Sequence, residues 1–220
     1  MDVFHRIEDV PVMSDAVLTI GSFDGLHRGH QEVIQRVVTT ARILEVPSVL
    51  ITFDPHPKEI LGKGGKFDLL MDVDRKLNLL GTMGLNTTLV IPFDLNFSMS
   101  SASEFLNEGI ISKLRPSRII VGYAPQFGYK REGDSNFLEA ESSRHGYKVE
   151  IVSGVGDEGE IYSSSRIRKL ISSGSVRRAS YDLGRAYGFE AKVVHGSGRG
   201  HGLSFPTANF VPTLDSQLPL

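Results

Sequence analysis

A regular alternation of short apolar segments with amphipathic segments is the sequence feature that most constrains the fold. The first apolar segment, AVLTIG, stops at Gly21, which is typical of a buried strand. The segment that follows it repeats apolar residues at Val33, Ile34, Val37 and Val38, a period typical of a helix with one buried face. The alternation predicts a Rossmann-like α/β fold, a parallel sheet with helices on both faces.

The same pattern gives the expected elements. Strands are predicted at 16–21, 48–53, 88–91, 118–121 and 148–152. Helices are predicted at 30–44, 72–83, 100–114, 136–145 and 164–172. We expect Ser101 and Glu104 to cap the third helix, 54–57 to form a rigid turn and 62–65 to form a loop.

Near Gly184 the pattern changes. Residues 190–195 alternate like a half-exposed antiparallel strand, and a glycine-rich stretch follows at 196–202. We therefore expect one domain over residues 1–183 and an incomplete β segment over residues 184–220. That segment is too short to close a β-barrel.

Composition narrows the class of protein. The formal net charge of -2 argues against a general nucleic-acid binder, and the absence of cysteine excludes disulfides and thiolate metal sites. The N-terminal residues MDVFHRIEDV lack the apolar core of a signal peptide, and no stretch has the roughly 18 apolar residues of a membrane span. We expect a cytoplasmic enzyme or binding protein, monomeric or weakly homo-oligomeric, with no nucleic-acid or membrane partner.

Residues 21–30, GSFDGLHRGH, stand between the first predicted strand and helix. Ligands of open parallel sheets bind beyond the carboxyl ends of the strands, where this loop is expected. Its glycines let the backbone approach phosphates, and a helix opening at Gly29 and His30 favours anions. His27 and His30 can then hydrogen-bond a pentavalent phosphorane and a departing pyrophosphate. The plainer alternative is a glycine-rich turn with two solvated histidines, which this position disfavours.

The run resembles the nucleotide-binding motif of the nucleotidylyltransferase superfamily, in the form found in bacterial riboflavin kinase/FAD synthetase. Further segments resemble that family in the same order: TFDPHP at 52–57, VGYAPQFGYKREG at 121–133, YSSSRIR at 162–168 and GSGRGHGLSFPTAN at 196–209. The resemblance covers essentially the whole chain. It implies the nucleotidylyltransferase fold and an FMN adenylyltransferase, which joins FMN to ATP, with Mg²⁺, to give FAD and diphosphate.

Site residues follow from these motifs. The expected catalytic residues are His27, His30 and Arg166, the last because guanidinium suits bidentate phosphate contacts. The expected ATP-binding residues are Gly21, Ser22, Phe23, Asp24, Gly29, Gly122, Ser163, Ser164, Ser165 and Arg168. The expected flavin-binding residues are Phe53, Asp54, His56, Pro57, Phe127, Tyr129 and Arg131.

Plainer alternatives stay open for three of these motifs. YSSSRIR can be a polar helix cap with a solvated basic face, and DPHP can be a turn selected for its shape. Asp24 is expected to shape its loop or approach a metal rather than act as a base. No protein metal-ligand set is expected, because Mg²⁺ is held largely by ATP phosphates and water.

The chain also departs from the family. Ala124 and Pro125 replace a polar residue and an aromatic one, and Gln126 stands where a basic residue is common. Ser204 replaces a glycine, and the chain ends before the segment expected to carry the kinase's catalytic acid, so riboflavin kinase activity is not expected. Two alternative functions remain: a flavin- or nucleotide-binding regulator with weakened catalysis, and a nucleotidylyltransferase acting on another phosphorylated acceptor.

Overall fold

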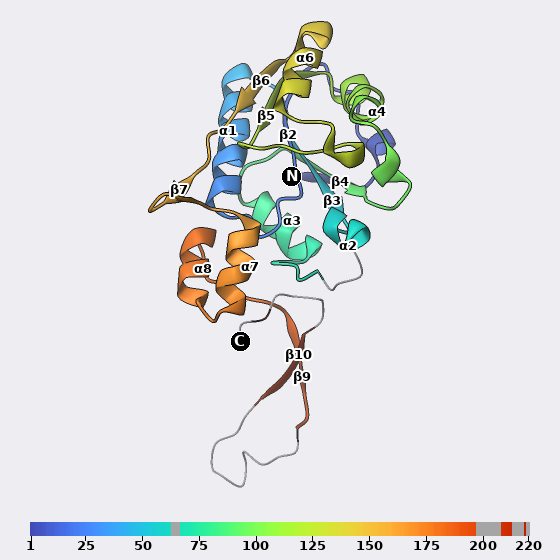
Figure 1. The fold of residues 1–220 in the computed structure, drawn as a ribbon. Coiled ribbons are helices and arrows are strands. Elements are labelled where there is room, and N and C mark those ends of the chain that lie inside the picture. The colour runs from blue at the N-terminus through green and yellow to red at the C-terminus, as the bar shows by residue number, and fades with distance from the viewer. Residues whose placement is uncertain (63–66, 197–207, 213–217, 219–220) are drawn as a thin grey trace.

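The structure is a computed structural model that describes residues 1–62, 67–196, 208–212 and 218 (Figure 1). Most of the expected loop 62–65 and of the glycine-rich stretch 196–202 lies outside the described residues. The same holds for Ser204, Pro206 and Thr207.

A six-stranded parallel sheet forms the centre of the molecule, in the order β1-β4-β3-β2-β5-β6. Its strands are β1 Asp2–Phe4, β2 Ala16–Ile20, β3 Ser48–Asp54, β4 Thr87–Pro92, β5 Pro116–Val121 and β6 Lys148–Ile151. The chain runs outward from β2 through β3 and β4, and then returns to pair β5 with the other side of β2. The order therefore reverses between β2 and β5, and the predicted Rossmann-like fold is confirmed.

Helices cover both faces of this sheet, as predicted (Figure 1). On one face lie α1 Arg28–Leu44 and α3 Val73–Gly81, whose Ile34, Val37 and Leu80 pack with Leu50 and Ile120 of the sheet. On the other face lie α4 Ala102–Glu104, η3 Phe105–Ile111, α5 Ser112–Leu114 and α6 Ser135–His145. This double cover explains why residues 48–53 of β3 are all buried, including Ser48 and Thr52.

Two expected elements differ in detail. The helix predicted at 100–114 carries the expected capping box, in which Ser101 Oγ accepts the Glu104 N–H at 3.1 Å, but its middle, η3, is π-helical. The turn at 54–57 runs directly into a short helix, α2 Pro57–Leu61. Pro57 is its first residue, a position where the missing N–H costs no hydrogen bond.

The C-terminal part has a small core of its own. Helices α7 Ser164–Ser172 and α8 Val176–Leu183 pack through Ile167, Ile171 and Leu183. Beyond them β9 Ala191–Val194 pairs antiparallel with β10 Asn209–Pro212, which confirms the antiparallel strand, and Figure 1 shows this hairpin apart from the sheet. The remaining short elements are η1 Ile7–Asp9, η2 Phe97–Met99, η4 Tyr129–Arg131, β7 Gly156–Asp157 and β8 Glu160–Ile161. Within the described residues no helix is long and apolar enough to cross a membrane.

Candidate active site

A cleft of about 1250 Å³ opens at the carboxyl ends of the sheet strands. Its wall includes Gly21 directly after β2, Gly122 directly after β5 and Val152 directly after β6. This is the point where the strand order reverses, the usual ligand position in open α/β sheets. The volume exceeds the roughly 300–1,000 Å³ of a single small-molecule pocket, so two ligands can lie side by side.

His27 and His30 face this cleft at the start of α1. The helix begins at Arg28, one residue before the expected Gly29, and His27 is its N-cap: His27 Nδ1 accepts the His30 N–H at 3.3 Å. The neutral ring of His27 therefore carries its proton on Nε2, where it can donate to a ligand. The two rings stack with centroids 3.6 Å apart, and His30 Nδ1 is buried without a partner among the described residues.

Both imidazoles are neutral near pH 7. Burial, together with a smaller effect of the nearby Arg185 charge, lowers the pKa of His27 to about 4. Burial also holds the pKa of His30 well below its ordinary value, with added repulsion from His27 and Lys76. The pair can thus direct hydrogen bonds at phosphate oxygens, but in the free protein it adds no full positive charge.

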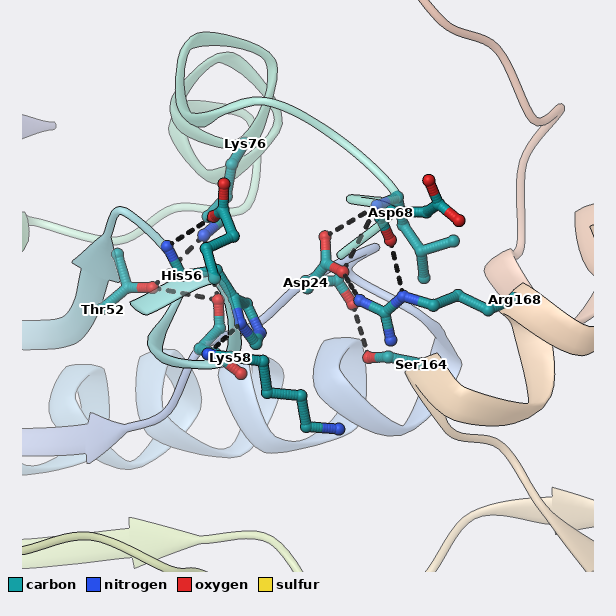
Figure 2. Close-up of polar contacts among 11 residues, drawn as sticks. Asp24, Thr52, His56, Lys58, Asp68, Lys76, Ser164 and Arg168 are labelled. Atoms are coloured by element: carbon teal, nitrogen blue, oxygen red, sulfur yellow. Dashed lines mark hydrogen bonds and ion pairs between the residues drawn. The ribbon is translucent and has the colours of Figure 1, made fainter. Parts of the chain in front are cut away.

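Asp24 shapes the 21–30 loop between β2 and α1, one of the two roles expected for it. Its carboxylate is buried, accepts the Leu70 N–H at 3.2 Å and forms an ion pair with Arg168 (Figure 2). Ser164 Oγ donates to the Asp24 carbonyl at 2.7 Å, which ties the loop to the start of α7. At Gly25, φ is 82° and an added Cβ would lie 2.7 Å from Leu70, so this turn requires glycine.

Lys76 of α3 is a buried residue of the site that the sequence did not identify. Its ammonium group donates to the Ser22 carbonyl at 2.9 Å and lies 3.4 Å from Thr52 Oγ1, and its exposed fraction is 5% (Figure 2). Thr52 Oγ1 donates to the same carbonyl at 3.1 Å. The sequence did contain a signal for its burial. Lys76 precedes the apolar Leu80 by four residues, so both lie on the same, buried face of α3.

The two expected phosphate-binding arginines lie against carboxylates instead of at the cleft wall. Arg166 Nε donates to the buried Asp182 at 2.6 Å and also pairs with Glu160. Arg168 pairs with Asp24 and donates to a backbone carbonyl. A buried carboxylate needs a counter-charge, which explains both placements. A contact of either guanidinium with ATP stays a prediction.

The other expected ATP-binding residues divide into two groups. Those at the cleft wall are Gly21, Ser22, Phe23, Gly29, Gly122 and Ser163. Asp24, Ser164 and Ser165 do not line the cleft. Ser163 Oγ accepts the Arg166 N–H at 3.2 Å, so the helix cap of the plainer interpretation is present. The basic face, however, is paired with carboxylates rather than solvated.

The expected flavin side of the cleft is aromatic. Phe53, His56, Pro57, Phe127 and Arg131 line it, whereas Asp54 and Tyr129 do not. Three further phenylalanines complete a cluster that the sequence did not predict: Phe93, Phe97 and Phe105, with centroid distances between 5.6 and 6.2 Å among them and Phe53. These residues come from separate segments, so only the fold brings them together.

His56 and Pro57 also form the start of α2. His56 Nδ1 accepts the Lys58 N–H at 3.0 Å, and its own N–H donates to the Glu59 carboxylate at 2.8 Å. Burial, together with repulsion from the nearby cations Arg168, Lys76 and Lys58, lowers the pKa of His56 to about 3. The DPHP segment therefore forms a turn of defined geometry at the start of α2, and its His56 ring also lines the cleft.

The charge of the cleft is one-sided. Among the described residues that line it there is no carboxylate, whereas Lys58, Lys130 and Arg131 all lie at the wall. Ala124 and Pro125 also lie there, so the departure from the family pattern falls in the cleft itself. The described residues contain no group of three or more metal-ligating His, Cys, Asp or Glu side chains. A positive, partly aromatic cleft at the switch point of a parallel sheet is the arrangement of nucleotide-binding α/β proteins.

Comparison with known proteins agrees with that class. The family model described as FAD synthetase matches residues 10–166, and the one described as riboflavin kinase matches residues 183–219. The chain belongs to the FAD synthetase family.

Individual relatives support this assignment. The bifunctional riboflavin kinase/FMN adenylyltransferase of Escherichia coli K12 is 30% identical over 205 residues, covering 93% of this chain and 65% of the relative. Its namesake from Buchnera aphidicola of Schizaphis graminum is 31% identical over 210 residues, covering 95% and 67%. A crystal structure described as a macrolide-efflux protein from Streptococcus pneumoniae is 30% identical with a TM-score of 0.87, covering 99% of this chain and 70% of that one. The chain thus spans about two thirds of the length of its curated relatives.

Proposed function

We propose that the chain is an FMN adenylyltransferase, which converts ATP and FMN into FAD and diphosphate. The observation that carries the proposal is the cleft itself. A neutral histidine pair at the start of α1 lies in one wall, and an aromatic cluster lies in another. Membership of the FAD synthetase family supports this choice of substrates.

In the proposed reaction an FMN phosphate oxygen attacks the α-phosphorus of ATP. The new O–P bond forms as the bond between the α-phosphorus and the α–β bridging oxygen breaks, and diphosphate leaves with that electron pair. No general base is required, because a phosphate monoester is already anionic near pH 7. Catalysis then depends on positioning and on stabilisation of the developing charge.

The chain's own residues have separate tasks in this scheme. His27 Nε2–H and the ring of His30 hydrogen-bond the phosphorane and the departing diphosphate, and the free N–H groups of α1 add to them. Lys76 and Thr52 hold the Ser22 carbonyl and so fix the loop that carries the histidines. Magnesium bound to ATP would neutralise part of the phosphate charge. The described cleft residues include no carboxylate, so ATP and water rather than side chains of this chain would hold the ion.

Residues 1–183 carry the transferase site, and 184–220 begin a second, β-rich domain. The limits of the two family matches and the β9–β10 pair support this division. The ligands are ATP, FMN, FAD and diphosphate, and we propose a cytoplasmic monomer or weak homo-oligomer.

The direct test is to incubate the chain with FMN, ATP and Mg²⁺ and to separate the flavins. FAD and diphosphate in equal amounts are the expected products. A second candidate is a flavin-binding regulator, which Ala124 and Pro125 at the cleft wall favour because they remove a polar contact. Tight binding of FMN and ATP without any FAD would support the regulator and contradict the enzyme.

A further inference from the structure

We propose that Lys58, Lys130 and Arg131 form a second anion site in the cleft, which binds the phosphate group of FMN. This inference rests on the proposed function, because it identifies the part of the site that recognises the acceptor substrate. It brings in Lys58 and Lys130, and it assigns Arg131 to the phosphate rather than to the flavin ring.

The first support is uncompensated charge. These three residues are all the lysines and arginines among the described residues lining the cleft, and no aspartate or glutamate lines it with them. None of the three forms an ion pair with a described carboxylate, and Figure 2 shows the ammonium group of Lys58 outside both hydrogen-bonded networks. An anionic ligand would supply the missing counter-charge.

The second support is convergence. Lys58 lies on α2 and Arg131 at the end of η4, yet the two are close enough to repel each other. Burial lowers the pKa of the Lys58 ammonium most, the charges of Arg168 and Arg131 lower it further, and the charge of Asp24 acts in the opposite direction. Like charges gathered at a cleft wall are typical of a functional site.

The third support is the backbone of the loop. Lys130 and Arg131 have φ values of 51° and 64°, a left-handed conformation that residues other than glycine rarely adopt. Such conformations persist where the surroundings fix them. Here Phe127 and Gly133 exchange two backbone hydrogen bonds of 3.0 Å, and the Tyr129 N–H donates to the Ser100 carbonyl at 2.8 Å. The loop therefore holds both basic residues at the cleft wall before any ligand binds.

The aromatic neighbours indicate whose phosphate is bound. Lys58 directly follows the cleft-lining His56 and Pro57, and the loop of Arg131 begins with Phe127. Phe127 packs against Phe105 of the aromatic cluster, with ring centroids 6.0 Å apart. These cations thus border the aromatic end of the cleft, where a flat ring system fits. A phosphate attached to that ring system is the anion expected between this end and the histidine pair.

The test compares the binding of FMN and riboflavin, which differ only in the phosphate. Calorimetric titration of the 220-residue chain without ATP gives both dissociation constants, for the wild type and for the Lys58→Met/Arg131→Met variant. We expect the double variant to bind FMN at least about tenfold more weakly and riboflavin within about twofold of the wild type. Lys58→Arg/Arg131→Lys should keep most FMN affinity. Lys148→Met, which removes an exposed charge on β6 outside the cleft, should change neither constant.

Three results would overturn the proposal: unchanged FMN affinity, an equal loss for FMN and riboflavin, or a loss of ATP affinity with FMN affinity retained. The unfolding temperature of each variant shows whether it is folded. If the methionine double variant does not fold, the comparison of FMN and riboflavin binding is made with Lys58→Arg/Arg131→Lys instead. No turnover enters these measurements. If the wild type binds FMN as expected but makes no FAD, the proposed reaction fails while the anion site stands.

Discussion

Two groups of basic side chains lie around the cleft, and their surroundings differ. Arg166 and Arg168 of α7 belong to the motif that suggests phosphate binding, but each is paired with a buried carboxylate, Asp182 or Asp24. The second group, which includes Lys58, belongs to no obvious phosphate motif and faces the cleft without a described acidic partner. The comparison teaches that compensation by neighbours, rather than membership of a motif, decides which cations remain available to an anionic ligand.

The histidines form a third case. They lie in the expected motif and at the cleft wall, but burial keeps them neutral. In the cleft wall, His27, His30 and the start of α1 thus offer directed hydrogen bonds, whereas the second group offers positive charge. The buried Lys76 lies behind the wall, where it donates to the Ser22 carbonyl. The following variants test each part of this division.

Removal of His30 should have the largest effect. His30→Ala deletes one of the two rings that we propose contact the reacting phosphates, and we expect turnover to fall by about 10²–10³-fold. Rates of FAD formation at saturating FMN and ATP give the measurement. His5→Ala, an exposed histidine outside the cleft, is the matched control and should leave the rate unchanged. A His30→Ala protein as fast as the wild type would exclude this role.

Arg168 should matter mainly to stability. Arg168→Met leaves the carboxylate of Asp24 buried without its counter-charge, which is expected to cost about 3 kcal/mol. Urea unfolding measures the loss. The double variant Asp24→Asn/Arg168→Met removes both charges and should recover most of it. If the single variant is as stable as the wild type, the pair does not hold the loop.

The sequence predicted the strands and helices that have a local apolar pattern. It did not predict contacts between residues that are far apart in the sequence. Strands β2 to β6 were found because each has a local apolar pattern, whereas β1 has three residues with no usable period. The histidine pair was found because both members lie in one run of residues. The pairing of Arg168 with a buried carboxylate was not predicted, because its partner Asp24 lies 144 positions away in the sequence.

Lys76 should link loop geometry to the histidine pKa. Lys76→Met removes a donor to the Ser22 carbonyl, so we expect turnover to fall about tenfold. It also removes a positive charge near His30, so the pKa of His30 should rise, as read from imidazole NMR titration. Lys76→Arg keeps the charge and should keep the pKa low. If Lys76→Met slows turnover but leaves the pKa of His30 unchanged, Lys76 only positions the loop and has no electrostatic effect on His30.

The smallest expected effect concerns pH. His56 has a folded pKa of about 3 against 6.5 when unperturbed, so the unfolded chain binds more protons between these values. The contribution of the neutral His56 ring to the free energy of unfolding is therefore fully present above about pH 6.5. It decreases as the pH falls from about 6.5 toward 3. His56→Asn keeps a cap acceptor without a titrating ring, so its unfolding temperature should depend less steeply on pH from 6.5 to 4. An equal slope in His56→Asn and the wild type would contradict the assignment.

The central claim is nucleotidyl transfer at the histidine pair, and the path of the phosphorus atoms tests it most directly. The chain is incubated with FMN, Mg²⁺ and ATP labelled in separate experiments at the α- or the γ-phosphorus. We predict that the α-label appears in FAD, that the γ-label appears in diphosphate, and that both transfers nearly stop in His30→Ala. Transfer of the γ-label to the flavin, or no transfer by the wild type, would contradict the claim.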